Sequence, residues 1–254
     1  MNLFKRIKDA VSRYDDTHNY TCDNCGGELF DGKRLCAECR SKLPYNAGVV
    51  CPFCGRRVKE EGVCLECKRQ PLLTDKARSL WLHEGDASKL VLHFKSGRRY
   101  LWRTFTEELL PLLELEFDDA DSIVFVPMTK KALRKRGYNQ SRLLSEGLSA
   151  RTGKPLLDAL EKTRETFDQR ALSRREREEN MKRCFRVTDK ASVKGKRILI
   201  VDDTLTTGAT TSAIAAVLKK AGASAVYALT VTSVEQKRPF GIFDPAEGVQ
   251  SIET

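Results

Sequence analysis

The chain has 254 residues, of which 41% are hydrophobic and 31% are charged, so it is long enough for one or two globular domains with a sizeable core. Its formal net charge of +10 favours an anionic partner, either nucleic acid or a phosphorylated small molecule. No stretch approaches the roughly 18 apolar residues that a membrane-spanning helix needs, so we expect no membrane insertion.

Residues 1–20 are expected to form an amphipathic helix. Leu3, Phe4, Ile7 and Val11 fall on one helical face. Lysine and arginine interrupt any apolar run, so the segment does not have the pattern of a secretory signal. We therefore expect a cytoplasmic protein, in which thiols stay reduced.

Eight of the nine cysteines lie between residues 22 and 67 and form four CxxC pairs. A CxxC pair points two thiolates at one metal from a tight turn, and two pairs complete the tetrahedral sulfur set of a structural zinc site. The pattern predicts a double zinc ribbon over residues 21–71 with two zinc ions, and it favours zinc over disulfides or a redox dithiol. The predicted ligands are Cys22, Cys25, Cys36, Cys39, Cys51, Cys54, Cys64 and Cys67.

The sequence does not determine which four of these cysteines bind each zinc ion. Sequential ligation, with the first four on one ion and the next four on another, is the simplest arrangement, and an interleaved one is the alternative. The segment has few apolar residues, so the metal must supply much of its folding free energy. The ninth cysteine, Cys184, stands alone and is expected to be a small core residue.

Residues 72–234 alternate strands with helices, which predicts an α/β domain with a parallel sheet and helices on both faces. The expected strands cover residues 77–85, 121–128, 196–203 and 224–233. The expected helices cover residues 87–97, 98–117 with Pro111 as an interruption, 141–153 and 210–223. Residues 235–254 show little pattern and are expected to be a tail.

Two polar segments stand out within this domain. Residues 129–142 carry six basic residues and no acid, and we interpret them as a basic loop. Residues 162–183 have mixed charge and few apolar side chains, which is typical of a functional flap or a disordered loop.

The stretch ILIVDDTLTTGATT, residues 198–211, predicts a ligand site. Ligands of open α/β sheets bind beyond the carboxyl ends of the strands, and a small-residue turn before a helix offers N–H groups to an anion. We expect Asp202 and Asp203 to bind diol hydroxyls or a cation, and the turn to bind a phosphate. The alternative is an aspartate pair that only caps the helix, followed by a plain turn. The predicted phosphate-binding residues are Thr206, Thr207, Gly208, Ala209 and Thr210.

ILIVDDTLTTGAT resembles the signature of type I phosphoribosyltransferases, which bind 5-phosphoribosyl-1-pyrophosphate (PRPP). VPMTKKALRKRGYNQSRLL resembles a segment of the ComF family of competence-associated, phosphoribosyltransferase-like proteins. The resemblance implies that Asp202 and Asp203 bind the ribose hydroxyls and that the following turn holds the 5-phosphate. It also implies that pyrophosphate, with its magnesium, is bound by Pro127, Met128, Thr129 and Lys130.

Two further elements resemble the ComF family. LHFKSG, with Lys95 and Gly97, stands where the family has a K-x-x-G element. Residues 164–185 resemble a family pattern that would supply the closing flap, with Lys130 and Arg164 as the candidates for neutralising the leaving pyrophosphate. The matching positions are Arg164, Thr166, Gln169, Leu172, Arg177, Asn180 and Phe185.

The resemblance leaves the activity open. A reaction would displace pyrophosphate from C1 of the ribose through an oxocarbenium-like transition state. Thr206 stands where purine-using relatives often carry an acid, which weakens a purine substrate, and no base pocket is evident. Three functions remain: a PRPP-binding protein linked to DNA uptake in natural transformation, a non-catalytic single-stranded DNA factor that retains the sugar-phosphate site, and a phosphoribosyltransferase acting on an unidentified base.

The basic segment is the candidate contact for single-stranded DNA, alongside DNA-uptake proteins as possible partners. Cations track a phosphate backbone and an aromatic ring offers a stacking face. The alternative is a solvated basic loop, and the same cations are also expected to serve pyrophosphate. The candidate residues are Lys131, Arg134, Lys135, Arg136 and Tyr138, with Arg56, Arg57 and Lys59 on the zinc ribbon.

Overall fold

The computed structural model describes residues 20–164 and 184–234. The predicted N-terminal helix and the predicted tail lie outside these residues. Most of the predicted flap does as well, including Thr166, Gln169, Leu172, Arg177 and Asn180.

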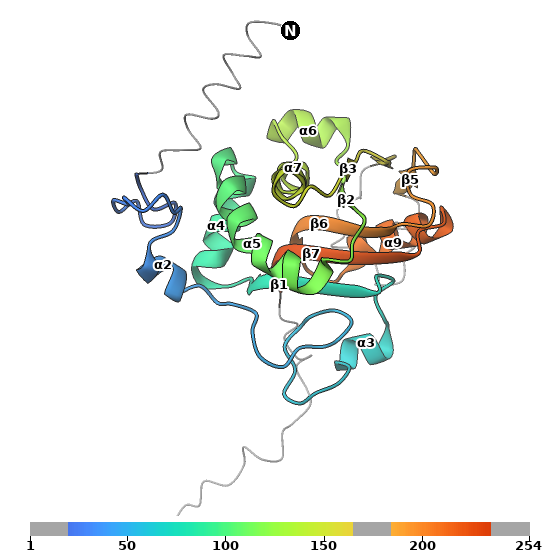
Figure 1. Cartoon of the computed structure of the whole chain (residues 1–254), viewed down its shortest axis with the longest axis horizontal. Helices are drawn as coiled ribbons and strands as arrows, with labels where there is room; N and C mark the ends of the chain where they lie inside the picture. The colour runs from blue at the N-terminus through green and yellow to red at the C-terminus, as the bar shows by residue number, and fades with distance from the viewer. Residues whose placement is uncertain (1–19, 165–183, 235–254) are drawn as a thin grey trace, which may run out of the picture.

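A five-stranded parallel sheet forms the centre of the larger domain, in the order β1-β7-β6-β2-β3 (Figure 1). The predicted α/β class with a parallel sheet is confirmed. Strand β3 is a two-residue edge strand that the pattern did not predict. The strands are β1 (Lys76–Leu82), β7 (Ala225–Ser233), β6 (Arg197–Leu205), β2 (Ser122–Phe125) and β3 (Leu156–Leu157).

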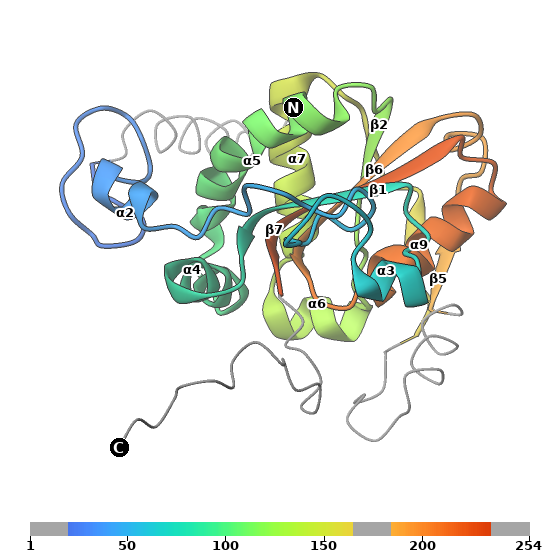
Figure 2. The same ribbon diagram turned by 90° about the horizontal axis from the view of Figure 1, so that it is seen from below.

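Helices cover both faces of this sheet (Figure 2). The central strand β6 shows why, because its aliphatic side chains alternate between two cores. Leu199 and Val201 belong to the core under α4, α5 and α7, whereas Ile198 and Ile200 belong to the core under α9. The elements are α4 (Gly85–Lys95), η1 (Arg99–Leu101), α5 (Trp102–Phe117), α7 (Gln140–Thr152) and α9 (Ala209–Lys220). Within the described residues, none of the helices combines the length and the apolar character that crossing a membrane requires.

Helix α5 runs through Pro111, so the predicted interruption at this residue is wrong. Proline in a helix interior removes one hydrogen bond and costs about 3 kcal/mol. Phe105, Leu109, Leu113 and Phe117 are completely buried along the same helix, on both sides of the proline. Their burial outweighs that cost, since each fully buried side chain contributes about 1.5–3 kcal/mol.

The basic segment forms a helix, α6 (Lys130–Arg136), so its interpretation as a loop is wrong. Its two ends explain why it is helical. The hydroxyl of Thr129 accepts a hydrogen bond from the amide of Ala132 at 3.2 Å, which caps the N-terminus. Gly137 ends the helix in the left-handed conformation at φ +83°, where glycine is favoured.

A small antiparallel pair, β4 (Leu160–Lys162) and β5 (Phe185–Val187), holds the two ends of the predicted flap together. The N-terminal module contains two short helices, α2 (Ala37–Ser41) and α3 (Leu65–Arg69), and each contains the last cysteine of one group, Cys39 or Cys67. Figure 1 shows α2 and α3 at well-separated places beside the larger domain.

Candidate functional site

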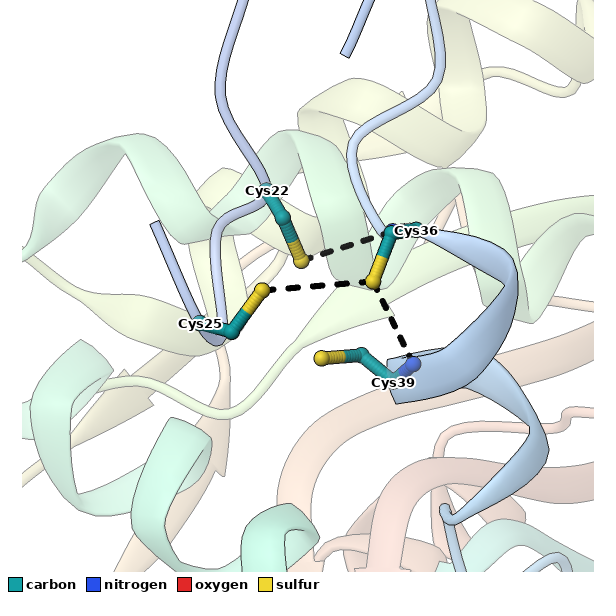
Figure 3. Close-up of side chains that lie close together, drawn as sticks. All are labelled: Cys22, Cys25, Cys36 and Cys39. Carbon is teal, nitrogen blue, oxygen red and sulfur yellow. Dashed lines mark hydrogen bonds between the residues drawn. The ribbon is translucent and has the colours of Figure 1, made fainter. Parts of the chain in front are cut away.

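The eight clustered cysteines form two groups of four in which the sulfur atoms lie within 4.8 Å of one another. Each group contains four successive cysteines, so the sequential order is the observed one and the interleaved alternative is excluded. Figure 3 shows the four side chains of the first group converging on a common centre. The groups are Cys22, Cys25, Cys36 and Cys39, and Cys51, Cys54, Cys64 and Cys67.

Backbone amides in both groups favour the thiolate form that zinc requires. In the first group, the amide of Cys36 donates to Cys22 Sγ at 3.4 Å and the amide of Cys39 donates to Cys36 Sγ at 3.3 Å. Burial opposes ionisation of Cys22, but amide hydrogen bonds outweigh it and lower the pKa of Cys22 to about 7. The same balance lowers the pKa of Cys51 to about 7, whereas burial raises the pKa of Cys39 to about 12 and that of Cys67 to about 11. Four convergent sulfurs with such donors fit a structural zinc ion.

Cys184 is buried and lies apart from both groups, as predicted for a small core residue. It packs in the same core as Phe185 and the apolar face of α9.

The two aspartates lie within strand β6, which continues to Leu205 and does not end at them as predicted. Pairing with the neighbouring strand explains why β6 is longer, because Thr204 and Leu205 still pair with Thr232 and Ser233 of β7. Because side chains alternate along a strand, Asp203 shares the face of Val201 and Asp202 shares the face of Ile200. The two carboxylates therefore flank the carboxyl end of the central strand.

Lys95 binds Asp203 directly, with 2.8 Å between Nζ and Oδ1. The same ammonium group donates to the hydroxyl of Thr204 at 3.2 Å. Sequence reasoning did not place Lys95 in the site, although the K-x-x-G resemblance was a signal for it. Lys95 and Lys162 both also act on Asp202, and each lowers its pKa.

The pKa of Asp202 is nevertheless raised, and burial is the largest cause. Burial, followed by the charge of Asp203, raises the pKa of Asp202 to about 7. The amide of Asp203 donates to Asp202 Oδ1 at 2.9 Å and opposes this shift. Near neutral pH the carboxyl group of Asp202 therefore exchanges a proton.

We expect Asp202→Asn to increase the melting temperature relative to the wild type, by an amount that grows between about pH 4 and pH 7 and then stays constant. The raised pKa means that the folded protein keeps a proton that the unfolded chain has lost, so wild-type stability falls across this range. Asparagine does not titrate and escapes this loss. Melting curves at several pH values measure the difference.

Asp121→Asn is the control of opposite sign. A hydrogen bond from Arg197 lowers the pKa of Asp121 to about 2, so its carboxylate stabilises the fold as the pH rises through the unfolded-state value near 4. The asparagine variant should melt lower than the wild type at neutral pH. A melting temperature of Asp202→Asn that tracks the wild type at every pH would refute the argument about Asp202.

The predicted phosphate turn lies between β6 and α9. Thr206 and Thr207 are exposed, while Gly208 precedes the helix at φ +80°. The hydroxyl of Thr207 accepts a hydrogen bond from the amide of Ala209 at 3.3 Å. The first turn of α9 therefore begins next to the aspartates and presents its positive end at the same edge of the sheet. We call residues 206–210 the phosphate loop.

The predicted pyrophosphate turn, residues 127–130, follows β2, which pairs with β6 on the side away from β7. Ser141 ties the two strands together at this edge. Its hydroxyl accepts from the amide of Val126 at 2.7 Å and donates to the carbonyl of Val201. The turn and the aspartates are thus held at neighbouring strand ends. Pro127 is buried, Met128 and Thr129 are half-buried and Lys130 is exposed.

A hollow of about 580 Å³ adjoins the pyrophosphate turn between α6, α7 and β4. Met128, Lys130, Tyr138 and Lys162 are among its lining residues. Tyr138 is held in place, because its hydroxyl donates to the carbonyl of Phe94 and its ring packs against Phe94 at 6.0 Å between centroids. Only the part of its ring that lines the hollow remains for a ligand.

Four of the other candidate nucleic-acid residues lie on α6, whereas Arg56 on the zinc ribbon is buried, so its predicted contact with DNA is wrong. Lys131, Arg134, Lys135 and Arg136 are exposed, and Arg136 donates to Gln140 Oε1 at 3.0 Å. Arg164 is exposed just after β4. Its proposed action on pyrophosphate depends on flap residues outside the described ones and stays a prediction.

Comparison with known proteins identifies two domains. Residues 19–68 match the model of the double zinc ribbon domain, and residues 139–251 match the model of the phosphoribosyl transferase domain. Competence protein F of Haemophilus influenzae is 31% identical over 220 residues, which cover 80% of this chain and 93% of the relative. DNA utilization protein YhgH of Escherichia coli is 32% identical over 203 residues, which cover 76% and 87%.

A further relative and a solved structure are less similar. Competence protein ComFC of Bacillus subtilis is 27% identical over 208 residues, which cover 78% of this chain and 84% of the relative. The solved glutamine PRPP amidotransferase of B. subtilis matches with a TM-score of 0.35 at 23% identity, over 54% of this chain and 26% of the other. The assignment to the fold class therefore rests on the sheet and on the domain model.

Proposed function

Because the chain belongs to the ComF family of competence and DNA utilization proteins, with a phosphoribosyl transferase domain behind a double zinc ribbon, we propose that it binds PRPP together with Mg²⁺. One observation carries the proposal: the aspartate pair lies at the same sheet edge as the N-terminus of α9 and the turn that contains the exposed Lys130. In this arrangement the phosphate loop holds the 5-phosphate, Asp202 and Asp203 hold the ribose hydroxyls, and residues 127–130 hold pyrophosphate.

Magnesium fits this arrangement because it usually binds through substrate phosphates and few protein ligands. When bound, it neutralises pyrophosphate charge. Lys130 supplies a cation on the protein side, and Arg164 is the proposed second one. Lys95 holds the carboxylate of Asp203 in position for the diol through their ion pair. A transfer reaction would require the protein to exclude water from C1 while pyrophosphate departs.

Calorimetry of the full chain with PRPP, in the presence and absence of Mg²⁺, tests this proposal. We expect saturable binding that strengthens with Mg²⁺. Ribose 5-phosphate should bind more weakly because it leaves the pyrophosphate turn empty. If neither PRPP nor ribose 5-phosphate binds, with or without Mg²⁺, the proposal is contradicted. Release of pyrophosphate in the presence of candidate bases then separates an enzyme from a binding protein.

We propose a second function in contact with single-stranded DNA, in the cytoplasm, where thiols remain available for zinc. The observation that favours it is helix α6, which presents its cations on the surface beside the pyrophosphate turn. Cations on a helix suit a flexible phosphate backbone without reading its sequence. The relatives named for competence and DNA utilization agree with such a role.

Removing two cations from α6 should weaken this binding and flatten its dependence on salt. For Arg134→Ala with Lys135→Ala, we expect the slope of log K against log salt to become shallower by about 1.4, because each phosphate contact on a single strand contributes about 0.7. Fluorescence titration of labelled single-stranded DNA at several salt concentrations measures the slope. Lys219→Ala with Lys220→Ala, at the far end of α9, removes the same charge and should leave the slope nearly unchanged.

Competition provides the second half of the test. If α6 and the pyrophosphate turn share cations, Mg-PRPP should weaken DNA binding. A protein that binds PRPP but no DNA at low salt would overturn the DNA proposal alone.

A further inference from the structure

The second cysteine group is connected to the phosphate loop through Arg56. This arginine is buried, with 7% of its surface exposed, although it belongs to a surface module. Its Nη2 donates to the carbonyl oxygen of Thr206 at 2.6 Å, across 150 residues of sequence. A hydrogen bond from a charged donor is stronger than one between neutral groups. The first residue of the phosphate loop is therefore held from behind by the zinc ribbon.

The backbone of Arg56 belongs to the cysteine group itself. The amide of Cys51 donates to the carbonyl of Arg56 at 2.8 Å. The amide of Arg56 donates to the sulfur of Cys54. One residue thus has its backbone fixed by two metal-site cysteines and its guanidinium fixed to the phosphate loop.

Leu72 makes a second connection between the same elements. It packs both against the second cysteine group and against the core under α9. A Cβ on Gly208 would displace the Cδ2 methyl group of Leu72, and the φ of +80° would strain any other residue at this position. The next residue, Leu73, donates its amide to the hydroxyl of Ser212 at 3.2 Å. The segment directly after the ribbon, residues 72–73, therefore links the second cysteine group to the phosphate loop and the first turn of α9.

The first cysteine group is docked elsewhere. Its anchors are on helix α5, where Thr104 donates to Asp23 and where Arg40 forms an ion pair with Glu108. Figure 2 shows α2 of this half at the opposite end of the molecule from α3 and α9. The two metal groups have similar cysteine geometry but different neighbours.

We infer that Arg56 is a positioning residue for the phosphate loop and that metal in the second cysteine group, but not in the first, strengthens binding of the 5-phosphate. This inference rests on the proposed function. By binding the Thr206 carbonyl, the guanidinium keeps this oxygen turned away from the phosphate site. A carbonyl oxygen turned toward that site would repel a phosphate. The same hydrogen bond restricts the loop before the ligand binds, so less conformational entropy is lost on binding.

The experiment compares three ligands on the full-length protein: ribose 5-phosphate, Mg-PRPP and magnesium pyrophosphate. For Arg56→Gln, we expect both ribose phosphates to bind about tenfold more weakly, the effect of one charged hydrogen bond. Magnesium pyrophosphate, which uses residues 127–130, should bind within about twofold of the wild type. Arg56→Lys should recover part of the loss because it keeps one charged donor.

Arg57→Gln is the matched control, because Arg57 is the next residue, carries the same charge and donates to the carbonyl of Tyr45 instead. It should bind all three ligands like the wild type. Equal loss of pyrophosphate in Arg56→Gln, an equal effect in Arg57→Gln, or unchanged ribose phosphate binding would overturn the inference.

Zinc release gives a reciprocal measurement, since coupling between two sites acts in both directions. With a chromogenic chelator, we expect ribose 5-phosphate to slow the loss of one of the two zinc ions and to leave the other unchanged. Arg56→Gln should abolish this protection. If zinc is lost at the same two rates with and without ribose 5-phosphate bound, the coupling is refuted.

Amide exchange of residues 206–212 distinguishes failure of this inference from failure of the proposed function. We expect faster exchange in Arg56→Gln than in Arg57→Gln even without ligand. A wild-type protein that binds none of the ligands contradicts the proposed function, and the exchange rates then still support or overturn the positioning role.

Discussion

Asp202→Asn with Asp203→Asn should weaken binding of Mg-PRPP by about two to four orders of magnitude. Each aspartate offers a charged acceptor to a ribose hydroxyl, and one such hydrogen bond is worth about 1.5–3 kcal/mol. Two of them amount to about 3–6 kcal/mol, where every 1.4 kcal/mol is tenfold in affinity. Calorimetry at pH 8 measures the loss under conditions in which the wild-type Asp202 is mostly ionised.

The matched control is Asp119→Asn with Asp121→Asn, which removes two carboxylates from the opposite edge of the sheet. These side chains pair with Arg197 at the start of β6, whereas the site aspartates lie near its end. The control pair should keep wild-type affinity despite lower stability. If the site variant is folded and binds Mg-PRPP with full affinity, the assignment of the aspartates to the ribose is wrong.

Features set by local spacing were predictable from the sequence. The cysteine groups follow from four CxxC pairs, because each pair builds its own turn before any distant contact forms. The central strand followed from the aliphatic run before Asp202, since a strand buried on both faces needs apolar residues at every position. The phosphate loop followed from small residues between that strand and a helical pattern.

Features set by distant contacts were not predictable. Strand β6 passes through both aspartates only because β7 continues beside it. Helix α6 has no buried residue, so it gives no apolar periodicity to detect, and its caps at Thr129 and Gly137 are the signals that favour a helix. Likewise, the partners of Lys95 and Arg56 lie 108 and 150 residues away, in positions that only the folded sheet brings together.

Removing metal from the double zinc ribbon should unfold residues 21–71 while the larger domain keeps its sheet. The second cysteine group shows why: its buried core consists of Cys51, Cys54 and Cys67 alone, with only partly buried neighbours around them. Three sulfurs cannot replace a hydrophobic core, whereas a structural zinc site contributes about 10–16 kcal/mol of apparent binding free energy. Elemental analysis should first find two zinc ions per chain, and limited proteolysis after chelation should then cut within the module.

Metal removal should also expose strand β1, because the ribbon covers the edge of the sheet that β1 forms. The amides of Ala77 and Leu82 donate to ribbon carbonyls at Phe53 and Pro44. An uncovered edge strand offers these groups to another chain, so the metal-free protein should self-associate, as light scattering would show. Restored zinc should reverse the effect if the chain has not aggregated. A zinc content near one per chain, or a chelated protein that resists both proteolysis and association, would contradict this account of how the metals hold the molecule together.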